Sequence, residues 1–215
     1  MSCRSEGIID FYLLAKSVVV AEGFAREIQW QDGIRISALA ESDFLREAAW
    51  VVLSAGMREE IVRRKFGAIS IAFCNWLSAR EIVVNAGCCR RAACGIFNHP
   101  KKIESILEIA RRVEGLGFDV FRSKLDVEGV GFLRSLPYMG PATSCHLAKN
   151  IGLDVAKPDR HLTRMSVLAG YNGPEQMCLA ISEAVGDRLS VVDLVMWRYA
   201  TVNPGYRSFL GMCLR

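Results

Sequence analysis

The sequence lacks a long apolar run, a secretory leader pattern, a low-complexity linker and a repeat of fixed period. A membrane-spanning helix needs a stretch of about eighteen or more apolar residues, and none is present. Near the N-terminus, Ile8–Val20 is interrupted by Asp10 and Lys16, a pattern that predicts an amphipathic helix rather than a leader. We therefore expect an intracellular protein that is not secreted and has no membrane partner.

Charge of one sign is not in large excess either. The 27 basic and 23 acidic residues leave a net charge of +4, which permits binding to nucleic acid without requiring it. Hydrophobic residues make up 51% of the 215 residues, a proportion that favours a compact globular chain. A chain of this length can bury one large core, or two smaller subdomains around a cleft.

Paired C-x-x-C motifs are also missing, although the chain has 8 cysteines. Without secretory features, these cysteines are expected to be reduced thiols. One local group, Cys88, Cys89, Cys94 and His99, has the donor atoms that zinc prefers. Adjacent cysteines project to different faces of a helix, so small buried side chains are the alternative explanation, and no metal site is predicted.

Helical periodicity, by contrast, runs along nearly the whole chain. It predicts helices over residues 5–24, 42–55, 57–66, 68–83, 87–96, 100–114, 127–136, 142–151, 159–169, 174–185 and 190–200. Only the short segment Gly33–Ile36 has the alternation of a strand. The best-bounded helix starts at Asn98-His99-Pro100 and stops at Gly115-Leu116-Gly117.

The segment LPYMGPATSCHLAKNIGLDVAKPDRHLTR, residues 136–164, joins two helical patterns by a tight turn. Pro137 ends the first pattern because it lacks an N–H and restricts the residue before it. Gly140 is expected to supply the positive φ of the turn, and Pro141, a favoured first-turn residue, begins the second helix. Within residues 140–143 the backbone N–H groups, which Pro141 lacks, are then unpaired and point outward, an arrangement that suits a phosphate oxygen.

This segment resembles the helix-hairpin-helix superfamily of DNA glycosylases. The usual pattern of that family is L-P-G-[VI]-G, a helix, and then [VL]-D-x-H-[VIL]-x-R; the chain has LPYMG and KPDRHLTR. Tyr138 and Met139 replace the usual Gly and Val of the turn. A weaker similarity lies upstream in residues 44–60, where Gly56 replaces a Gln that fills the gap left by the flipped base in many members.

The resemblance implies an all-α fold in which two helical subdomains flank a DNA-binding cleft, with residues 1–215 forming one glycosylase-like unit. One subdomain would span residues 40–155 and contain the hairpin at 127–151, and the other would combine residues 1–39 with 156–215. The implied partner is double-stranded DNA containing a modified or damaged base, bound across the junction by a monomer. Such a protein would act in the cytoplasm, at the nucleoid, or in the nucleus.

The same resemblance assigns roles to individual residues. Asp159 would be the catalytic carboxylate, which stabilises the sugar cation and positions the attacking water. The alternative is that Asp159 only caps a helix. His161 would contact the DNA backbone near the lesion, with a helix-surface role as its alternative. The expected DNA contacts are Pro137, Tyr138, Met139, Gly140, Ala142, Thr143 and His161.

Ala142 occupies the position at which strand-nicking members of the family carry a Schiff-base Lys. Alanine has no amine, so the resemblance is to the monofunctional branch, in which water is the nucleophile. His146 lies one turn later and would line the base pocket or, alternatively, belong to the core. The expected base pocket is Ala142, His146 and Trp197; the other aromatic candidates are Trp50, Trp76, Tyr199 and Tyr12.

Only Cys178 and Cys213 lie beyond Asp159, so the iron–sulfur cluster of several relatives is not expected. No other cofactor is predicted, and a monovalent cation at the hairpin is left open. The predicted activity is hydrolysis of the N-glycosidic bond of a damaged or modified base. Two alternatives stay open: a non-catalytic helix-hairpin-helix DNA-binding protein, and a bifunctional glycosylase and AP lyase. The base is also open among an oxidised purine, an alkylated purine, a mismatched base and a modified pyrimidine.

Overall fold

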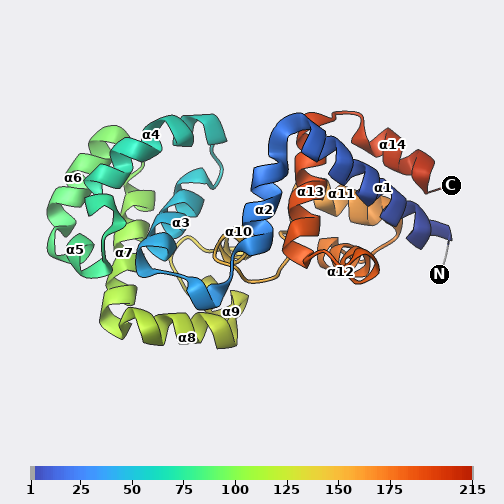
Figure 1. Cartoon of the computed structure of the whole chain (residues 1–215). Helices are drawn as coiled ribbons and strands as arrows, with labels where there is room; N and C mark the ends of the chain where they lie inside the picture. The colour runs from blue at the N-terminus through green and yellow to red at the C-terminus, as the bar shows by residue number, and fades with distance from the viewer. Residues whose placement is uncertain (1–2, 215) are drawn as a thin grey trace. The chain divides into compact units, whose positions relative to one another are not determined.

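The computed structural model describes residues 3–214, and every regular element among them is helical (Figure 1). The predicted all-α class is therefore confirmed. The chain forms two compact units: unit 1 contains the segment up to Ile34 and the segment from Gly152 onward, and unit 2 is the continuous segment Arg35–Ile151. No helix in the described part of the chain is long and apolar enough to cross a membrane.

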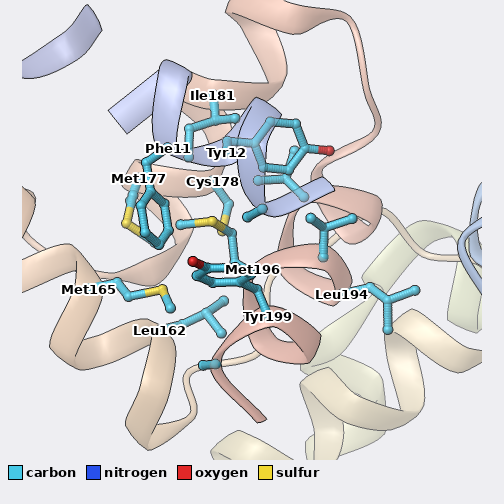
Figure 2. Close-up of a cluster of buried hydrophobic side chains, with 14 of the residues drawn as sticks. Phe11, Tyr12, Leu162, Met165, Met177, Cys178, Ile181, Leu194, Met196 and Tyr199 are labelled. Carbon is cyan, nitrogen blue, oxygen red and sulfur yellow. The ribbon is translucent and has the colours of Figure 1, made fainter. Parts of the chain in front are cut away.

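Unit 1 is built around α13 (Leu189–Val202), which is apolar on almost every side and packs against α1, α2, α11 and α12. The aromatic ring of Phe11 meets that of Tyr199 edge-on, with 5.3 Å between centroids. Figure 2 shows this core, in which sulfur-containing side chains fill the space between the aromatic rings. The remaining elements are α1 (Cys3–Val19), a π-helical turn (Val20–Phe24), α2 (Ala25–Gly33), α11 (Arg160–Ala169), α12 (Pro174–Val185) and α14 (Tyr206–Cys213).

Unit 2 is built around α7 (Pro100–Leu116), which packs against α3, α5, α6 and α8. Ile103, Ile106, Leu107, Ala110 and Val113 form its buried face, at the spacing expected of an amphipathic helix. The remaining helices are α3 (Glu41–Ser54), α4 (Glu59–Ala72), α5 (Ala79–Val84), α6 (Ala86–Ile96), α8 (Phe118–Glu128), α9 (Val130–Arg134) and α10 (Pro141–Asn150), with 3₁₀ turns at Ile36–Ala38 and Cys74–Trp76.

Arg188 binds both points at which the chain leaves and re-enters unit 1. Its Nη1 donates to the carbonyl oxygens of Gln31 and Ile34, at 3.2 and 2.9 Å. Its Nη2 donates to the carbonyl oxygen of Gly152 at 3.0 Å. These contacts fix Gly152 in unit 1, whereas the turn Ile36–Ala38 packs on α8 of unit 2. The crossings therefore lie a few residues before the expected positions, 39/40 and 155/156.

Several predicted elements have different bounds in the structure. The helix predicted over 5–24 ends at Val19, because the π-helical turn that follows contains Gly23 with φ 92°. The strand-like alternation at Gly33–Ile36 does not produce a strand: α2 ends at Gly33, and the next two residues are extended without belonging to a strand. Extended residues form a strand only when a neighbouring strand supplies backbone partners.

Two further predicted helices are broken by residues with positive φ. The helix predicted over 68–83 is interrupted at Cys74–Trp76, where the three φ values are 55°, 51° and 62°. The helix predicted over 127–136 is divided by Gly129, with φ 55°, so that its first residues belong to α8 and the rest form α9. Apolar spacing continues across both breaks, which explains why periodicity does not show them.

Candidate functional site

The hairpin in unit 2 joins α9 to α10 through residues 135–140. Its positive φ lies at Tyr138, at 67°, whereas Gly140 is extended with φ −75° and ψ −178°. The expectation that Gly140 supplies the left-handed residue is therefore wrong. The family pattern that the hairpin resembles has Gly at the position of Tyr138, so a residue that disfavours positive φ occupies a position where glycine is usual.

Thr143 closes this turn with its hydroxyl group, which lies 3.1 Å from the carbonyl oxygens of both Tyr138 and Gly140. Pro141 is the first residue of α10, as predicted. Ala142 is exposed and Pro137 and Thr143 are half-buried, but the side chain of Met139 is buried. Met139 can therefore offer only its backbone to a ligand.

Tyr138 packs against the start of α7. Its ring lies edge-on to His99, with 6.4 Å between centroids, and the Lys102 ammonium is 5.5 Å from the ring centre. Lys102 is only 1% exposed, and its Nζ donates to the carbonyl oxygens of Leu53 and Ala55, each at 2.6 Å. Burial lowers the pKa of Lys102. In the sequence, Lys102 looks like any lysine of an amphipathic helix, so these buried contacts could not be predicted.

The other residues predicted on α10 differ in exposure. His146 is half-buried and lies one turn after the exposed Ala142, so the two side chains share a helix face. Lys149 is buried, at 6% exposed. Lys149 therefore does not contribute to an exposed basic surface beside the hairpin.

Asp159 lies in unit 1 and is the N-cap of α11. Its Oδ1 accepts hydrogen bonds from the backbone amides of His161 and Leu162, at 2.7 and 2.9 Å. Its Oδ2 has no hydrogen-bond partner within residues 3–214. One oxygen therefore fixes the carboxylate and leaves the other available, so that capping and a chemical role are compatible.

The turn before Asp159 is also fixed. The Asp159 amide donates to the carbonyl oxygen of Lys157 at 2.8 Å, and the Lys157 amide donates to Oδ1 of Asp193 at 2.7 Å. Asp193 is buried in α13. A carboxylate held in this way does not have to reorganise before it acts, which is the requirement for electrostatic stabilisation of a transition state. Asp193 is a site residue that sequence reasoning missed, because its partner is 36 positions away.

His161 is the second residue of α11 and is half-buried. Its Nδ1 lies 3.2 Å from the hydroxyl oxygen of Tyr206, and its Nε2 accepts a hydrogen bond from Nε of Arg160 at 3.3 Å. Burial lowers the pKa of His161; the nearby Asp159 opposes this shift, and Arg160 and Arg164 add to it. The ring is therefore biased toward its neutral form.

Trp197 is half-buried in α13, and the guanidinium of Arg198 lies 4.6 Å from its ring centre. The same guanidinium is 4.4 Å from the ring centre of Phe24 and forms two hydrogen bonds to Glu27, at 3.0 and 2.6 Å. A base could stack on Trp197 only beside this arginine or in its place. Of the other aromatic candidates, Tyr12, Trp76 and Tyr199 are buried and Trp50 is half-buried.

The structure brings the predicted site residues together in two groups. Residues 137–143 and His146 belong to unit 2, and Asp159, His161 and Trp197 belong to unit 1. No group of three or more His, Cys, Asp or Glu among the described residues could hold a metal ion. A zinc site is therefore not supported at Cys88, Cys89, Cys94 and His99.

Comparison with known proteins gives one informative result. No protein-family model matches the sequence, and no curated protein is similar to it. In structure, the chain is similar to an 8-oxoguanine glycosylase/lyase from Methanocaldococcus jannaschii, solved in complex with 15mer DNA containing 8-oxoguanine. The two share 22% identity with a TM-score of 0.65, over 91% of this chain and 97% of that chain. The chain therefore shares the fold of that glycosylase/lyase.

Proposed function

We propose that this protein is a DNA glycosylase that removes a damaged or modified base from double-stranded DNA by hydrolysis. The observation that carries the proposal is Asp159, whose Oδ1 is fixed by two backbone amides and whose Oδ2 has no partner in the described part of the chain. The fold shared with a DNA glycosylase and the hairpin in unit 2 support it.

The reaction needs a fixed negative charge. As the bond between the base and C1′ of the sugar breaks, the electron pair leaves with the base and positive charge develops on the sugar. Oδ2 of Asp159 stabilises this charge and orients a water molecule, whose oxygen forms the new bond to C1′. The water proton passes to the carboxylate or to solvent, the departing base takes up a proton, and the strand keeps an abasic sugar.

The hairpin supplies the grip on DNA in this proposal. The first amides of α10 are free of intrahelical partners and suit phosphate oxygens, and the exposed Arg134, Arg160 and Arg164 add positive charge. A monovalent cation at the hairpin remains part of the proposal. The carbonyl oxygen of Tyr138 would be one of its ligands, through the lone pair that Thr143 leaves unused; that of Gly140 already accepts from Thr143 and from the Ser144 amide.

We further propose that the enzyme is monofunctional. Ala142 gives the hairpin helix no amine at the Schiff-base position. Lys102, which contacts the hairpin, and Lys149 of α10 are both buried. Water is then the nucleophile.

The first substrate to test is 8-oxoguanine, because it is the lesion in the DNA bound to the similar structure. A panel of duplexes should also contain an alkylated purine, a mismatched base and a modified pyrimidine. Wild type should release at least one free base. Binding to every duplex without any release would favour the alternative, a non-catalytic DNA-binding protein.

Asp159→Asn tests the assigned group. Asparagine caps helices about as well as aspartate, so folding should be preserved. Base release should fall by about 10²- to 10³-fold, as when one preorganised electrostatic group is lost. Asp154 provides a matched control, because this exposed aspartate in the same unit accepts a hydrogen bond from the Ser190 amide at 2.8 Å. Asp154→Asn should keep the wild-type rate; equal rates for Asp159→Asn and wild type would refute the assignment.

A lyase is the second candidate, because the similar structure is that of a glycosylase/lyase. Only a lyase cuts the strand without added alkali. Denaturing gels of the product, run with and without alkali, therefore separate the two activities.

A further inference from the structure

His161 has a buried partner on another helix. The hydroxyl oxygen of Tyr206 lies 3.2 Å from its Nδ1, and the two rings are 5.6 Å apart. Tyr206 is the first residue of α14 and is only 3% exposed, whereas His161 is half-buried in the first turn of α11. The hydroxyl group of Tyr206 therefore faces the histidine from the interior of unit 1.

The other ring nitrogen of His161 faces an exposed side chain. Nε of Arg160 donates to Nε2 at 3.3 Å, and arginine can only donate, so Nε2 is an acceptor in this arrangement. In a neutral ring the proton then lies on Nδ1 and is donated to Tyr206. A phosphate oxygen only accepts hydrogen bonds, so contact with the DNA backbone requires the proton on Nε2 instead.

A tyrosine hydroxyl serves both arrangements, because it can accept from Nδ1 or donate to it. When Arg160 turns to a phosphate, Tyr206 can donate to Nδ1 and leave the Nε2 hydrogen directed outward. The charged groups next to the ring are Asp159, Arg160 and Arg164, all on the same segment as His161, and Tyr206 is the partner from α14.

We propose that Tyr206 is a positioning residue for His161, holding its ring so that Nε2 donates to a DNA phosphate beside the base to be removed. The inference rests on the proposed function and on the role that the family resemblance gives His161, a contact with the DNA backbone. Tyr206 itself touches neither DNA nor the reacting atoms; it acts through the histidine.

Tyr206→Phe removes the hydroxyl and keeps the ring that fills the core. In the free protein, ¹⁵N NMR of the His161 side chain should show mainly the Nδ1-protonated tautomer in wild type and a smaller share of it in the variant, because the Nδ1 proton loses its acceptor. Duplex affinity at fixed salt should fall about fivefold, the effect of one lost hydrogen bond. Tyr199→Phe is the control, because it also removes a buried hydroxyl in unit 1, one that accepts from Asn203 at 2.9 Å. It should leave the tautomer and the affinity unchanged.

A double-mutant cycle decides whether Tyr206 acts through His161. In a His161→Ala background, Tyr206→Phe should weaken binding by less than about twofold, since coupled residues are not additive. Full additivity, or wild-type affinity for Tyr206→Phe alone, would overturn the inference. Base release, measured on the same variants, tests the proposed function separately. If the double-mutant cycle gives the predicted affinities but wild type releases no base, the glycosylase activity is refuted and the positioning role of Tyr206 remains. Absence of DNA binding by wild type would refute both.

Discussion

The Lys102 ammonium lies 5.5 Å from the centre of the Tyr138 ring. Tyr138 is the residue of the hairpin with positive φ, a conformation that disfavours any side chain. The contact with Lys102 and the edge-on contact with His99 offset part of this strain.

Alanine usually stabilises a protein more than glycine does, and this order should be reversed at position 138. Tyr138→Gly removes the strain together with the ring, whereas Tyr138→Ala removes the ring and keeps the strain. We expect the Gly variant to be more stable than the Ala variant by about 1 kcal/mol, measured by urea denaturation. Gly131→Ala, in α9, is the control, because its Cβ would meet nothing within 4 Å and its φ is not positive; there the Ala variant should be the more stable by about 0.5–1 kcal/mol. Equal stability of Tyr138→Ala and Tyr138→Gly would contradict this account.

Lys102 should make stability depend on pH. Burial lowers the pKa of Lys102 in the folded protein below 10.5, the ordinary value that applies to the unfolded chain. At a pH between these two pKa values, the unfolded chain therefore binds more protons than the folded one. The free energy of unfolding of wild type should then rise with pH relative to that of Lys102→Met, by at most about 1.4 kcal/mol per pH unit. Urea denaturation from neutral pH toward 10.5 measures the difference. The exposed Lys101→Met is the control, and parallel curves for Lys102→Met and wild type would show that Lys102 is not shifted.

Gly7 allows α1 and α14 to approach closely. A Cβ at this position would overlap the carbonyl oxygen of Cys213. Gly7→Ala should therefore destabilise unit 1 by about 1–3 kcal/mol, the range for overpacking. Gly95→Ala, in α6, meets nothing within 4 Å and should instead gain about 0.5–1 kcal/mol from the loss of glycine flexibility. Thermal unfolding of both variants tests the contrast; equal melting temperatures would argue against the close approach.

Ala142 sets the expected outcome of borohydride trapping. Because no amine lies at the Schiff-base position, wild type should form no covalent adduct with DNA during turnover. Ala142→Lys should gain trapping and strand nicking to the extent that burial lowers the pKa of the new lysine. Efficient trapping of wild type, abolished by replacing another lysine, would place the protein among the lyases.

Local signals account for the parts of the structure that the sequence predicts well. The helix start at Pro100 and its end before Gly117 follow from the residues themselves, and so does the start of α10 at Pro141. The capping geometry of Asp159 also follows from its place before an apolar helical pattern.

The relationships that the sequence does not reveal are non-local or contrary to residue preference. Positive φ at Tyr138 opposes the usual preference for glycine, which is why residue preference points wrongly to Gly140. The pairing of His161 with Tyr206 spans 45 positions, and no periodicity links them. Tyr206 is buried because α14 packs on α1 and α11, contacts that only the folded chain brings about.

The discontinuous make-up of unit 1 has a consequence for folding during synthesis. Unit 2 is a continuous segment, and all its packing partners have left the ribosome soon after Ile151 has been made. The apolar face of α1, by contrast, packs on α11, α12, α13 and α14, which follow more than 140 residues later. Arg188 binds the carbonyl groups of Ile34 and Gly152, which lie on the two sides of unit 2 in the sequence. The early and late parts of unit 1 can therefore join once Arg188 has been synthesised. The N-terminal helix is therefore the segment that depends most on protection by chaperones while the chain is being made.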